Sequence, residues 1–313
     1  MYAYLIRRIL ATIPVMAVVA IFVFSLLFLS PGDPAAIIAG DLATADDIAR
    51  IRERLGLNEP FLVQFGKWVF NLAQGDLGVS IFSNLPVSKL MLQRLEPTLL
   101  LTTTTLIIAI CAAVPMGVIA AWKAGTIIDR GVMLFAVLGF SFPSFVLGYL
   151  LIYGFAIKLE VLPVQGYTSI SKGFGPFLNN IILPSLTLGM VQAALIARMT
   201  RTSVLEVLAE DYIRTAHSKG LATRKVLIGH ALKNAAVPIV TIIGVSFALL
   251  IGGAIITESV FAIPGLGRLT VDAILRRDYP IIQGVILVFS GAYVLVNLAV
   301  DIIYTFLDPR IRY

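Results

Sequence analysis

Six long, continuously apolar blocks constrain the fold of this 313-residue sequence more than any other feature. A helix needs about 20 residues to cross the roughly 30 Å hydrocarbon layer of a membrane, and each block is long enough. A closed β-barrel is the other structure that can span a membrane, but its strands alternate apolar and polar residues, and these blocks do not. We therefore predict six transmembrane helices near residues 9–30, 98–122, 131–157, 181–203, 235–258 and 281–305.

The composition agrees with residence in a bilayer. Hydrophobic residues make up 58% of the chain and charged residues 13%, which is unlike ordinary soluble domains. The first block follows Arg7 and Arg8, as the core of a signal peptide would, but it is longer than a usual core and no A-x-A cleavage sequence follows directly. We predict that it stays as the first span of an all-α integral membrane protein.

Lys and Arg predict the orientation of the spans, because cytoplasmic loops carry an excess of both residues. With a cytoplasmic N-terminus, the inside segments carry most of them: Arg7, Arg8, Lys123, Arg130, Arg198, Arg201, Arg214, Lys219, Arg224, Lys225, Lys233, Arg310 and Arg312. The short outside loops carry fewer: Lys158, Lys172, Arg268, Arg276 and Arg277. We therefore predict that both termini are cytoplasmic, and lipid headgroups rather than nucleic acid account for the net charge of +6.

This orientation divides the chain into three parts. Residues 1–30 hold the N-terminus and the first transmembrane helix, and residues 31–97 form an extracytoplasmic segment between helices 1 and 2. Residues 98–313 form a five-helix transmembrane core, which includes a cytoplasmic loop at 204–234. The helical pattern of the fourth span continues past the membrane into that loop, which suggests a rigid connection between them.

Turn and capping residues predict further detail outside the membrane. Thr44-x-x-Asp47 predicts a capped helix that stops at Gly56, and the two prolines of P-G-D-P end the first span. A second short helix is expected at 61–72, and a third after the fifth span, around Leu269. Segment 31–97 is either an ordered connector or a docking surface for an external partner.

Residues that are absent restrict the mechanism. No Asp, Glu, Lys, Arg or His lies in the middle of a predicted span, which disfavours an ion-coupled transporter and an intramembrane hydrolase. The sequence has no G-x-x-x-x-G-K-[ST] loop for ATP, and its single cysteine, Cys111, cannot form an internal disulfide. We predict no catalytic residue, no metal and no cofactor on this chain. A transporter of this kind must take its energy from another subunit.

The one long, strongly charged segment between spans is EDYIRTAHSKGLATRKVLIGHALKN, which begins at Glu210. Its first half reads as a short helix. Asp211 near the start and Lys219 at the end suit the charges that a helix prefers at its two ends, and Gly220 is a natural helix stop. Charge runs are most often solvated loops that carry topology charges, and composition alone favours that interpretation.

Spacing and sequence give this segment a second interpretation. Tyr212, Ala216 and Gly220 fall at i, i+4 and i+8 on one face, where two small residues would let a partner approach closely. Thr223 can cap a second helix that runs toward the fifth span.

The charged segment resembles the cytoplasmic "EAA" loop of ABC-importer permeases, in the form that dipeptide and oligopeptide permeases carry. The matching residues are D-Y-I-R-T-A-x-x-K-G-L followed by H-A-L-x-N-A. Arg214 replaces a Glu and Lys233 replaces a Pro of the general importer pattern, and the peptide branch shares both departures. The resemblance runs end to end through P-G-D-P, Q-G-D-L-G, P-G-L-G-R and R-D-Y-P.

The resemblance implies an architecture and a set of partners. This chain would be a non-enzymatic permease subunit in a bacterial or archaeal cytoplasmic membrane. It would pair with a second, related permease, and two cytoplasmic ATPases would bind ATP and Mg. An extracytoplasmic binding protein would deliver a di- or oligopeptide. The residues implied to engage the ATPases, chiefly through the face of Tyr212, Ala216 and Gly220, are Glu210, Asp211, Tyr212, Arg214, Thr215, Ala216, Lys219, Gly220 and Leu221.

Polar residues inside two spans are candidates for a substrate path. Thr102 to Thr105 open the second span, where hydroxyls most often bond to their own helix or pack on a neighbour. The third span contains Gly139, Pro143 and Gly148, which favour a kink. The side chains that could line a cavity beside it, or equally pack at helix contacts, are Ser141, Phe142, Ser144 and Tyr149.

Several alternatives stay open at this point. Permeases for glutathione or nickel resemble the chain closely enough that either remains a candidate substrate. A passive channel would show ATP-independent flux. A membrane scaffold or sensor would use the same ATPases without accumulating substrate.

Overall fold

The computed structural model describes residues 2–29, 33–39, 43–54 and 56–307 of the chain. Within those ranges every regular element is a helix, and the β pairing is one isolated bridge between Val79 and Pro86. The predicted all-α fold class is confirmed. Part of the P-G-D-P turn and the charged C-terminal residues 308–313 lie outside the described ranges.

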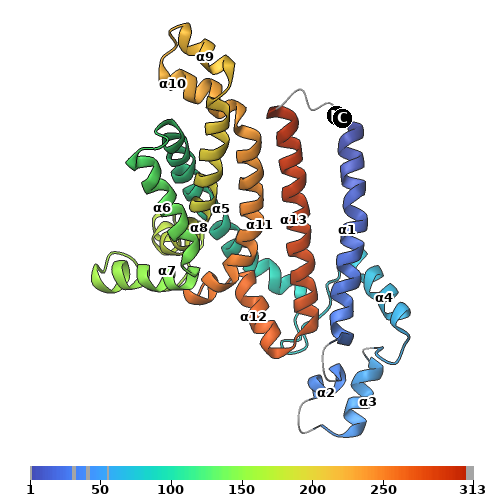
Figure 1. The fold of residues 1–313 in the computed structure, drawn as a ribbon. Coiled ribbons are helices and arrows are strands. Elements are labelled where there is room, and N and C mark those ends of the chain that lie inside the picture. The colour runs from blue at the N-terminus through green and yellow to red at the C-terminus, as the bar shows by residue number, and fades with distance from the viewer. Residues whose placement is uncertain (1, 30–32, 40–42, 55, 308–313) are drawn as a thin grey trace. The chain divides into compact units, whose positions relative to one another are not determined.

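Among the described residues, five helices are long and apolar enough to cross a membrane, and Figure 1 shows their course. They are α1 Tyr2–Leu29, α5 Val87–Trp122, α8 Phe174–Leu208, α11 Ala236–Val260 and α13 Tyr279–Leu307. These helices correspond to five of the six apolar blocks. The predicted third span is different, because it consists of α6 Ile127–Ser141 followed by α7 Ser144–Leu151 and the π-helix η1 Ile152–Lys158.

The third block bends by 103° between α6 and α7, so the kink that Pro143 favours is present at 131–157 and is sharp. Pro143 explains the position of the bend. A residue before proline is pushed out of the helical region, and Phe142 has extended angles of φ −96° and ψ 128°. Pro143 lacks an N–H and stands at the N-cap of α7, where no intrahelical donor is lost.

Two other prolines lie inside long helices. α5 begins at Val87 and runs through Pro97. Likewise Pro184 lies in the interior of α8, which begins at Phe174. Prolines are tolerated inside membrane helices, where neighbouring groups satisfy the freed carbonyls.

The chain divides into two compact units, and the first comprises residues 1–95 and 268–294. It contains α1, α2 Pro34–Ala39, α3 Ala45–Arg54, α4 Phe61–Ala73, the start of α5, most of α12 Leu266–Arg276 and the first half of α13. The predicted capping box at α3 is present, because Asp47 N–H donates to Thr44 Oγ1 (3.3 Å) while Thr44 N–H donates to Asp47 Oδ2 (3.1 Å). Gly56 follows α3 with φ +66°.

Aromatic packing attaches α4 to α1 within the first unit. The ring of Phe24 lies 5.4 Å from Phe61, 5.5 Å from Phe65 and 5.3 Å from Trp68, measured between centroids. Aromatic pairs at such distances add to the stabilisation that burial alone provides. The C-terminal part of α1 and the aromatic stripe of α4 therefore form one packed layer.

Two of the sequence motifs meet inside the first unit. Asp278 of R-D-Y-P is 2% exposed, and the Ser80 hydroxyl just after Q-G-D-L-G donates to its Oδ2 at 2.6 Å. The Ile81 N–H donates to the other carboxylate oxygen at 3.3 Å. A buried carboxylate is costly unless its oxygens accept hydrogen bonds, so these motifs hold each other in place.

The second unit comprises residues 96–267 and 295–313, with α8 at its centre. It also contains α9 Asp211–Ser218, α10 Thr223–Lys225, the π-helix η3 Val226–Leu232 and the short η2 Ile170–Lys172. α8 packs against α6, α7 and α11. Small residues permit these contacts: a Cβ at Gly139 would lie 2.7 Å from the Cβ of Ala194, and one at Gly117 would lie 2.6 Å from that of Thr200.

The threonines of α5 mainly serve the helix itself. Thr102 Oγ1 donates to the Thr98 carbonyl at 2.9 Å, and Thr104 Oγ1 donates to the Leu100 carbonyl at 2.7 Å. Thr104 also shares a 2.8 Å hydrogen bond with Ser185 of α8. Thr102 and Thr104 therefore bond to their own helix, and Thr104 also contacts a neighbouring helix, as predicted.

Candidate functional site: a charged helix on a self-packed base

The charged segment, residues 210–234, follows directly from α8. That helix runs unbroken through 35 residues to Leu208, as the continuous pattern beyond Arg198 predicted. Two residues separate its end from the start of α9, and α10 lies beside α9 at the same end of α8 (Figure 1). The short connection means that α9 cannot move far without α8.

The end of α9 is a Schellman motif, and this explains Gly220. Gly220 has φ +75°, its N–H donates to the His217 carbonyl at 2.9 Å, and the N–H of Leu221 donates to the Ala216 carbonyl at 3.2 Å. A left-handed residue at that position is usually glycine because a Cβ would be strained there. The predicted helix from residue 211 and its stop at Gly220 are therefore present in the structure.

One side of α9 is buried against its own chain. Ile213 and Ala216 are 2% and 8% exposed, and with Val226 they form a small apolar core. Val207, Leu208 and Leu221 pack around that core. The structure therefore turns Ala216 inward, whereas the i, i+4, i+8 spacing had placed it with Tyr212 and Gly220 on a face open to a partner. Spacing alone missed Ile213, which supplies the most buried side chain of α9.

The opposite side of α9 is polar and exposed. Arg214 Nη1 lies 3.3 Å from Asp211 Oδ1, but the two side chains are 77% and 93% exposed. Such an exposed pair stabilises the fold by about 0.2–1 kcal/mol. Both side chains can therefore leave the pair and bind a partner at little cost. The exposed members of the predicted set are Glu210, Asp211, Tyr212, Arg214, Thr215, Lys219 and Gly220.

A hydrogen bond joins α9 to the far end of the segment. Asn234 Nδ2 donates to the Tyr212 hydroxyl at 3.0 Å and to the His230 carbonyl at 2.8 Å. The predicted cap at Thr223 is wrong, because Ala222 is the N-cap of α10 and no side-chain cap bond forms. The second helix of the segment is mostly the π-helix η3, whose residues Val226 and Ala231 are buried.

The candidate substrate-path residues lie at and beyond the bend of the third block. Phe142 and Tyr149 are 45% and 59% exposed, and Ser144 is the first residue of α7. The Ser141 hydroxyl donates to the Val137 carbonyl of its own helix at 2.9 Å. Ser141 is the last residue of α6 and Ser144 the first of α7, so the two serines flank the bend, while Tyr149 lies further along α7.

The P-G-L-G motif has a structural function that the sequence did not reveal. Glu258, at the end of α11, is fully buried, and the Thr98 hydroxyl donates to its Oε1 at 2.6 Å. The N–H of Leu266 donates to that same hydroxyl at 2.8 Å. A Cβ added at Gly265 would overlap the Glu258 carboxyl group, and one at Gly267 would lie 2.6 Å from Ile255 Cα. We call Thr98, Glu258, Gly265, Leu266 and Gly267 the carboxylate cradle.

Comparisons with known proteins agree with this geometry. Residues 113–313 match the family model described as the inner membrane component of binding-protein-dependent transport systems. Residues 1–102 match the N-terminal model of membrane components of the same systems. The chain belongs to this family of transport permeases. It is a multi-pass inner-membrane component, as the apolar helices require.

Individual relatives share the full length of this permease. A protein of Sinorhizobium fredii named as a probable peptide ABC transporter permease is 55% identical over 313 residues, covering all of both chains. A glutathione transport system permease of Escherichia coli is 45% identical over the same full length. The solved structure of the MetNI methionine ABC transporter, in inward-facing conformations, matches 71% of this chain and 97% of its own with a TM-score of 0.60. At 18% identity, that likeness supports the fold alone.

Proposed function

We propose that this permease is one membrane subunit of an ABC importer for di- or oligopeptides, and that α9 is the helix through which ATPase subunits drive it. Family membership and a full-length relative named for peptide transport support the substrate class. The same relatives include a glutathione permease, and glutathione is itself a short peptide, so it remains the alternative substrate.

The observation that carries this proposal is the two-sided construction of α9. Its apolar side, which includes Ile213, packs against Val226 of the same segment and against the end of α8. Its polar side is exposed. α9 itself follows α8, which is an unbroken helix of 35 residues. A partner that binds the polar side can push on α8 without first unfolding the segment. Population shift between inward-open and outward-open states needs such a stiff connection.

The remaining parts of the proposal follow from this role. The bent α6–α7 pair counts as one span, giving six spans with both termini in the cytoplasm and residues 204–234 as the coupling loop. Residues 1–30, 31–97 and 98–313 serve as the first span, the extracytoplasmic segment and the five-helix core. A second related permease completes the path, and a binding protein delivers the substrate. Ser141, Phe142, Ser144 and Tyr149 line part of the path.

Energy in this scheme comes from other chains. Two cytoplasmic ATPases bind ATP and Mg and hydrolyse the nucleotide, while this subunit is non-catalytic. The polar residues of α9 transmit closure of the ATPases to α8. A bacterial or archaeal cytoplasmic membrane provides the setting.

The test begins with gentle extraction of the chain from its native membrane and mass spectrometry of the proteins that accompany it. We expect a second six-span permease and P-loop ATPases in stoichiometric amounts. The purified assembly, reconstituted in vesicles with its binding protein, should accumulate a labelled dipeptide only with ATP. ATP-independent flux would instead support a passive channel, and ATPase binding without accumulation would support a scaffold.

A further inference from the structure

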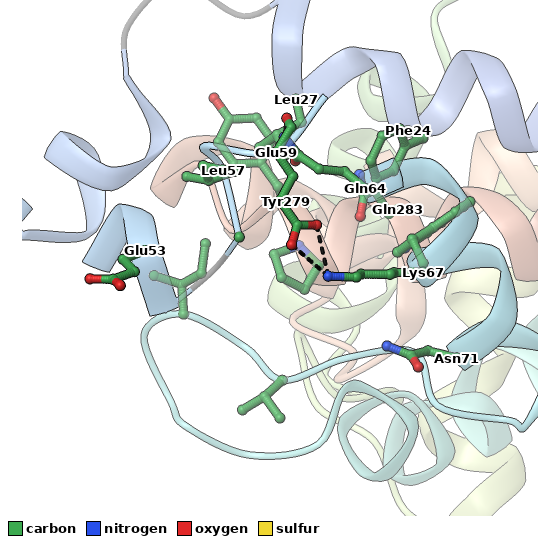
Figure 2. Close-up of a pocket in the computed structure, with 15 residues that line it drawn as sticks. Phe24, Leu27, Glu53, Leu57, Glu59, Gln64, Lys67, Asn71, Tyr279 and Gln283 are labelled. Carbon is green, nitrogen blue, oxygen red and sulfur yellow. Dashed lines mark hydrogen bonds and ion pairs between the residues drawn. The ribbon is translucent and has the colours of Figure 1, made fainter. Parts of the chain in front are cut away.

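A cavity of about 510 Å³ lies within the first unit (Figure 2). Its walls come from the C-terminal part of α1, the turn after α3, one side of α4, the extended stretch around residue 80 and the start of α13. Its volume is within the range of pockets that take small molecules. Neither the proposed transport path nor the charged segment uses any of its residues.

The sequence of α4 builds the cavity because this helix has three different sides. Phe61, Phe65 and Trp68 pack on α1, as described above. Gln64, Lys67 and Asn71 recur at i, i+3 and i+7, so they form a polar stripe on one face. All three line the cavity.

Charges of both signs face the cavity. Lys67 Nζ lies 2.6 Å and 2.8 Å from the two carboxylate oxygens of Glu59 (Figure 2). These two side chains are 64% and 37% exposed, so the pair contributes little stability and can exchange its partners. Glu53 lines the cavity as well, and its carboxylate has no ion pair or hydrogen bond among the residues that the structure describes.

An uncommitted amide lies in the wall. Gln283 of α13 lines the cavity and is 7% exposed, and its side chain makes no hydrogen bond to any described residue. Its amide can therefore exchange hydrogen bonds with whatever fills the cavity. Asn71 supplies a second amide with no side-chain partner in the described chain. These groups are available to a ligand that carries polar atoms of its own.

We propose that this cavity binds a small zwitterion that carries a primary ammonium and an oxyanion. The ammonium is held by the carboxylate of Glu59, and the oxyanion by Lys67. Gln283 and Asn71 bond to polar atoms between the two charges, while Phe24 and Trp68 contact an apolar part. Two sources supply this chemistry: a free short peptide, and the phosphatidylethanolamine headgroup of a membrane lipid.

Tryptophan fluorescence can measure this binding without transport. The chain has two tryptophans, and only Trp68 lines the cavity. In the Trp122→Phe variant, all tryptophan emission therefore comes from Trp68. The full chain is placed in nanodiscs of phosphatidylglycerol alone and titrated with dialanine, N-acetyl-dialanine and dialanine amide. A second preparation contains phosphatidylethanolamine. We expect a saturable change in Trp68 emission with dialanine or with phosphatidylethanolamine, and a weaker response when either peptide charge is blocked.

Variants identify the cavity as the site. Lys67→Met should weaken binding about tenfold or more, which is the usual effect of losing one charged hydrogen bond. Lys89→Met is the matched control, since Lys89 is exposed on α5 and does not line the cavity. Gln283→Leu should weaken binding by about fivefold. A response to dialanine alone assigns a free peptide as the source, and a response to the lipid alone assigns the headgroup.

The proposal fails if no zwitterion gives a saturable change in a chain that elutes as a folded species. It fails equally if Lys67→Met and Lys89→Met bind alike. Either result leaves the transport function untouched, because that function is measured by ATP-dependent accumulation in vesicles. Conversely, a chain that binds dialanine at Trp68 but does not transport would retain this site and lose the proposed function.

Discussion

The carboxylate cradle and the charged segment are both rich in polar groups and glycine, but the two regions use them in opposite ways. In the cradle, Glu258 is fully buried and its surroundings leave no room for a Cβ at Gly265. In the charged segment, Gly220 has open space around it, and the ionic side chains of α9 are exposed. Burial therefore separates polar groups that maintain the fold from polar groups that a partner can use.

The largest effect should come from Gly265→Ala in the cradle. The new Cβ would overlap the Glu258 carboxyl group, which has no space to withdraw because it is fully buried. Overpacking and a disrupted buried carboxylate each cost about 1–3 kcal/mol or more, and together they approach the stability of a domain. We expect almost no folded protein, measured by fluorescence-detected size-exclusion chromatography.

Gly252→Ala is the control for this substitution. Gly252 lies in α11, and a Cβ there would meet no atom within 4 Å. Alanine favours a helix over glycine by about 1 kcal/mol, so the control chain should be as stable as the natural one or slightly more so. Normal folding of Gly265→Ala would show that the cradle rearranges easily, and the contrast between the two regions would lose its basis.

A smaller effect on stability is expected from Gly220→Ala in the charged segment. A residue with a Cβ at φ +75° costs about 1–2 kcal/mol, which is enough to loosen the end of α9 without unfolding the chain. Transport driven by the ATPases should therefore fall more than the melting temperature does. The measurement pairs dipeptide accumulation in vesicles with a thermal melt of the same assembly.

Gly229→Ala provides the comparison within the same segment. Gly229 lies in η3, has no positive φ and has open space for a Cβ. That variant should transport normally. Equal transport by both variants would mean that the shape of the α9 end has no part in coupling.

The sequence predicted these two regions unequally, for a physical reason. The end of α9 depends on hydrogen bonds between residues a few positions apart, so Gly220 and its flanking charges were enough to predict it. The cradle joins Thr98 to Glu258 across 160 positions, and nothing in a local pattern shows that P-G-L-G surrounds a carboxylate. Ala216 was assigned to the wrong side because periodicity gives the faces of a helix but not which face its own chain covers.

The membrane helices show the same limit. Six long apolar blocks were predicted to be spans, and five of them are single long helices among the described residues, because length and hydropathy are local properties. The bend in the third block also followed from a local feature, Pro143, but its size of 103° depends on packing against α8 and α11 that no local pattern contains. The unbroken passage of α5 through Pro97 was missed because a proline normally predicts a boundary.

Tyr212→Phe should produce a still smaller change. It removes the hydroxyl that accepts a 3.0 Å hydrogen bond from Asn234, but Asn234 keeps its bond to the His230 carbonyl. The cost should be about 0.5–1.5 kcal/mol, seen as a modest fall in melting temperature. Tyr153→Phe is a suitable control, because the Tyr153 ring faces Lys158 and its hydroxyl has no hydrogen-bond partner among the described residues. A fall of the same size in the control would remove any special role for the bond between α9 and Asn234.

The smallest effect on stability is expected from Arg214→Ala, which tests the comparison most directly. The pair with Asp211 is 77% and 93% exposed, so its loss should change the free energy of unfolding by less than about 0.5 kcal/mol. Arg214 faces solvent from α9 and adds little to the stability of the fold, so its side chain can bind an ATPase. We therefore expect an unchanged melting temperature together with weaker ATPase stimulation by substrate, and a further weakening as salt screens the remaining charges. If melting temperature and stimulation fell together, Arg214 would belong with the buried groups of the cradle, and exposure would not distinguish the two kinds of polar site.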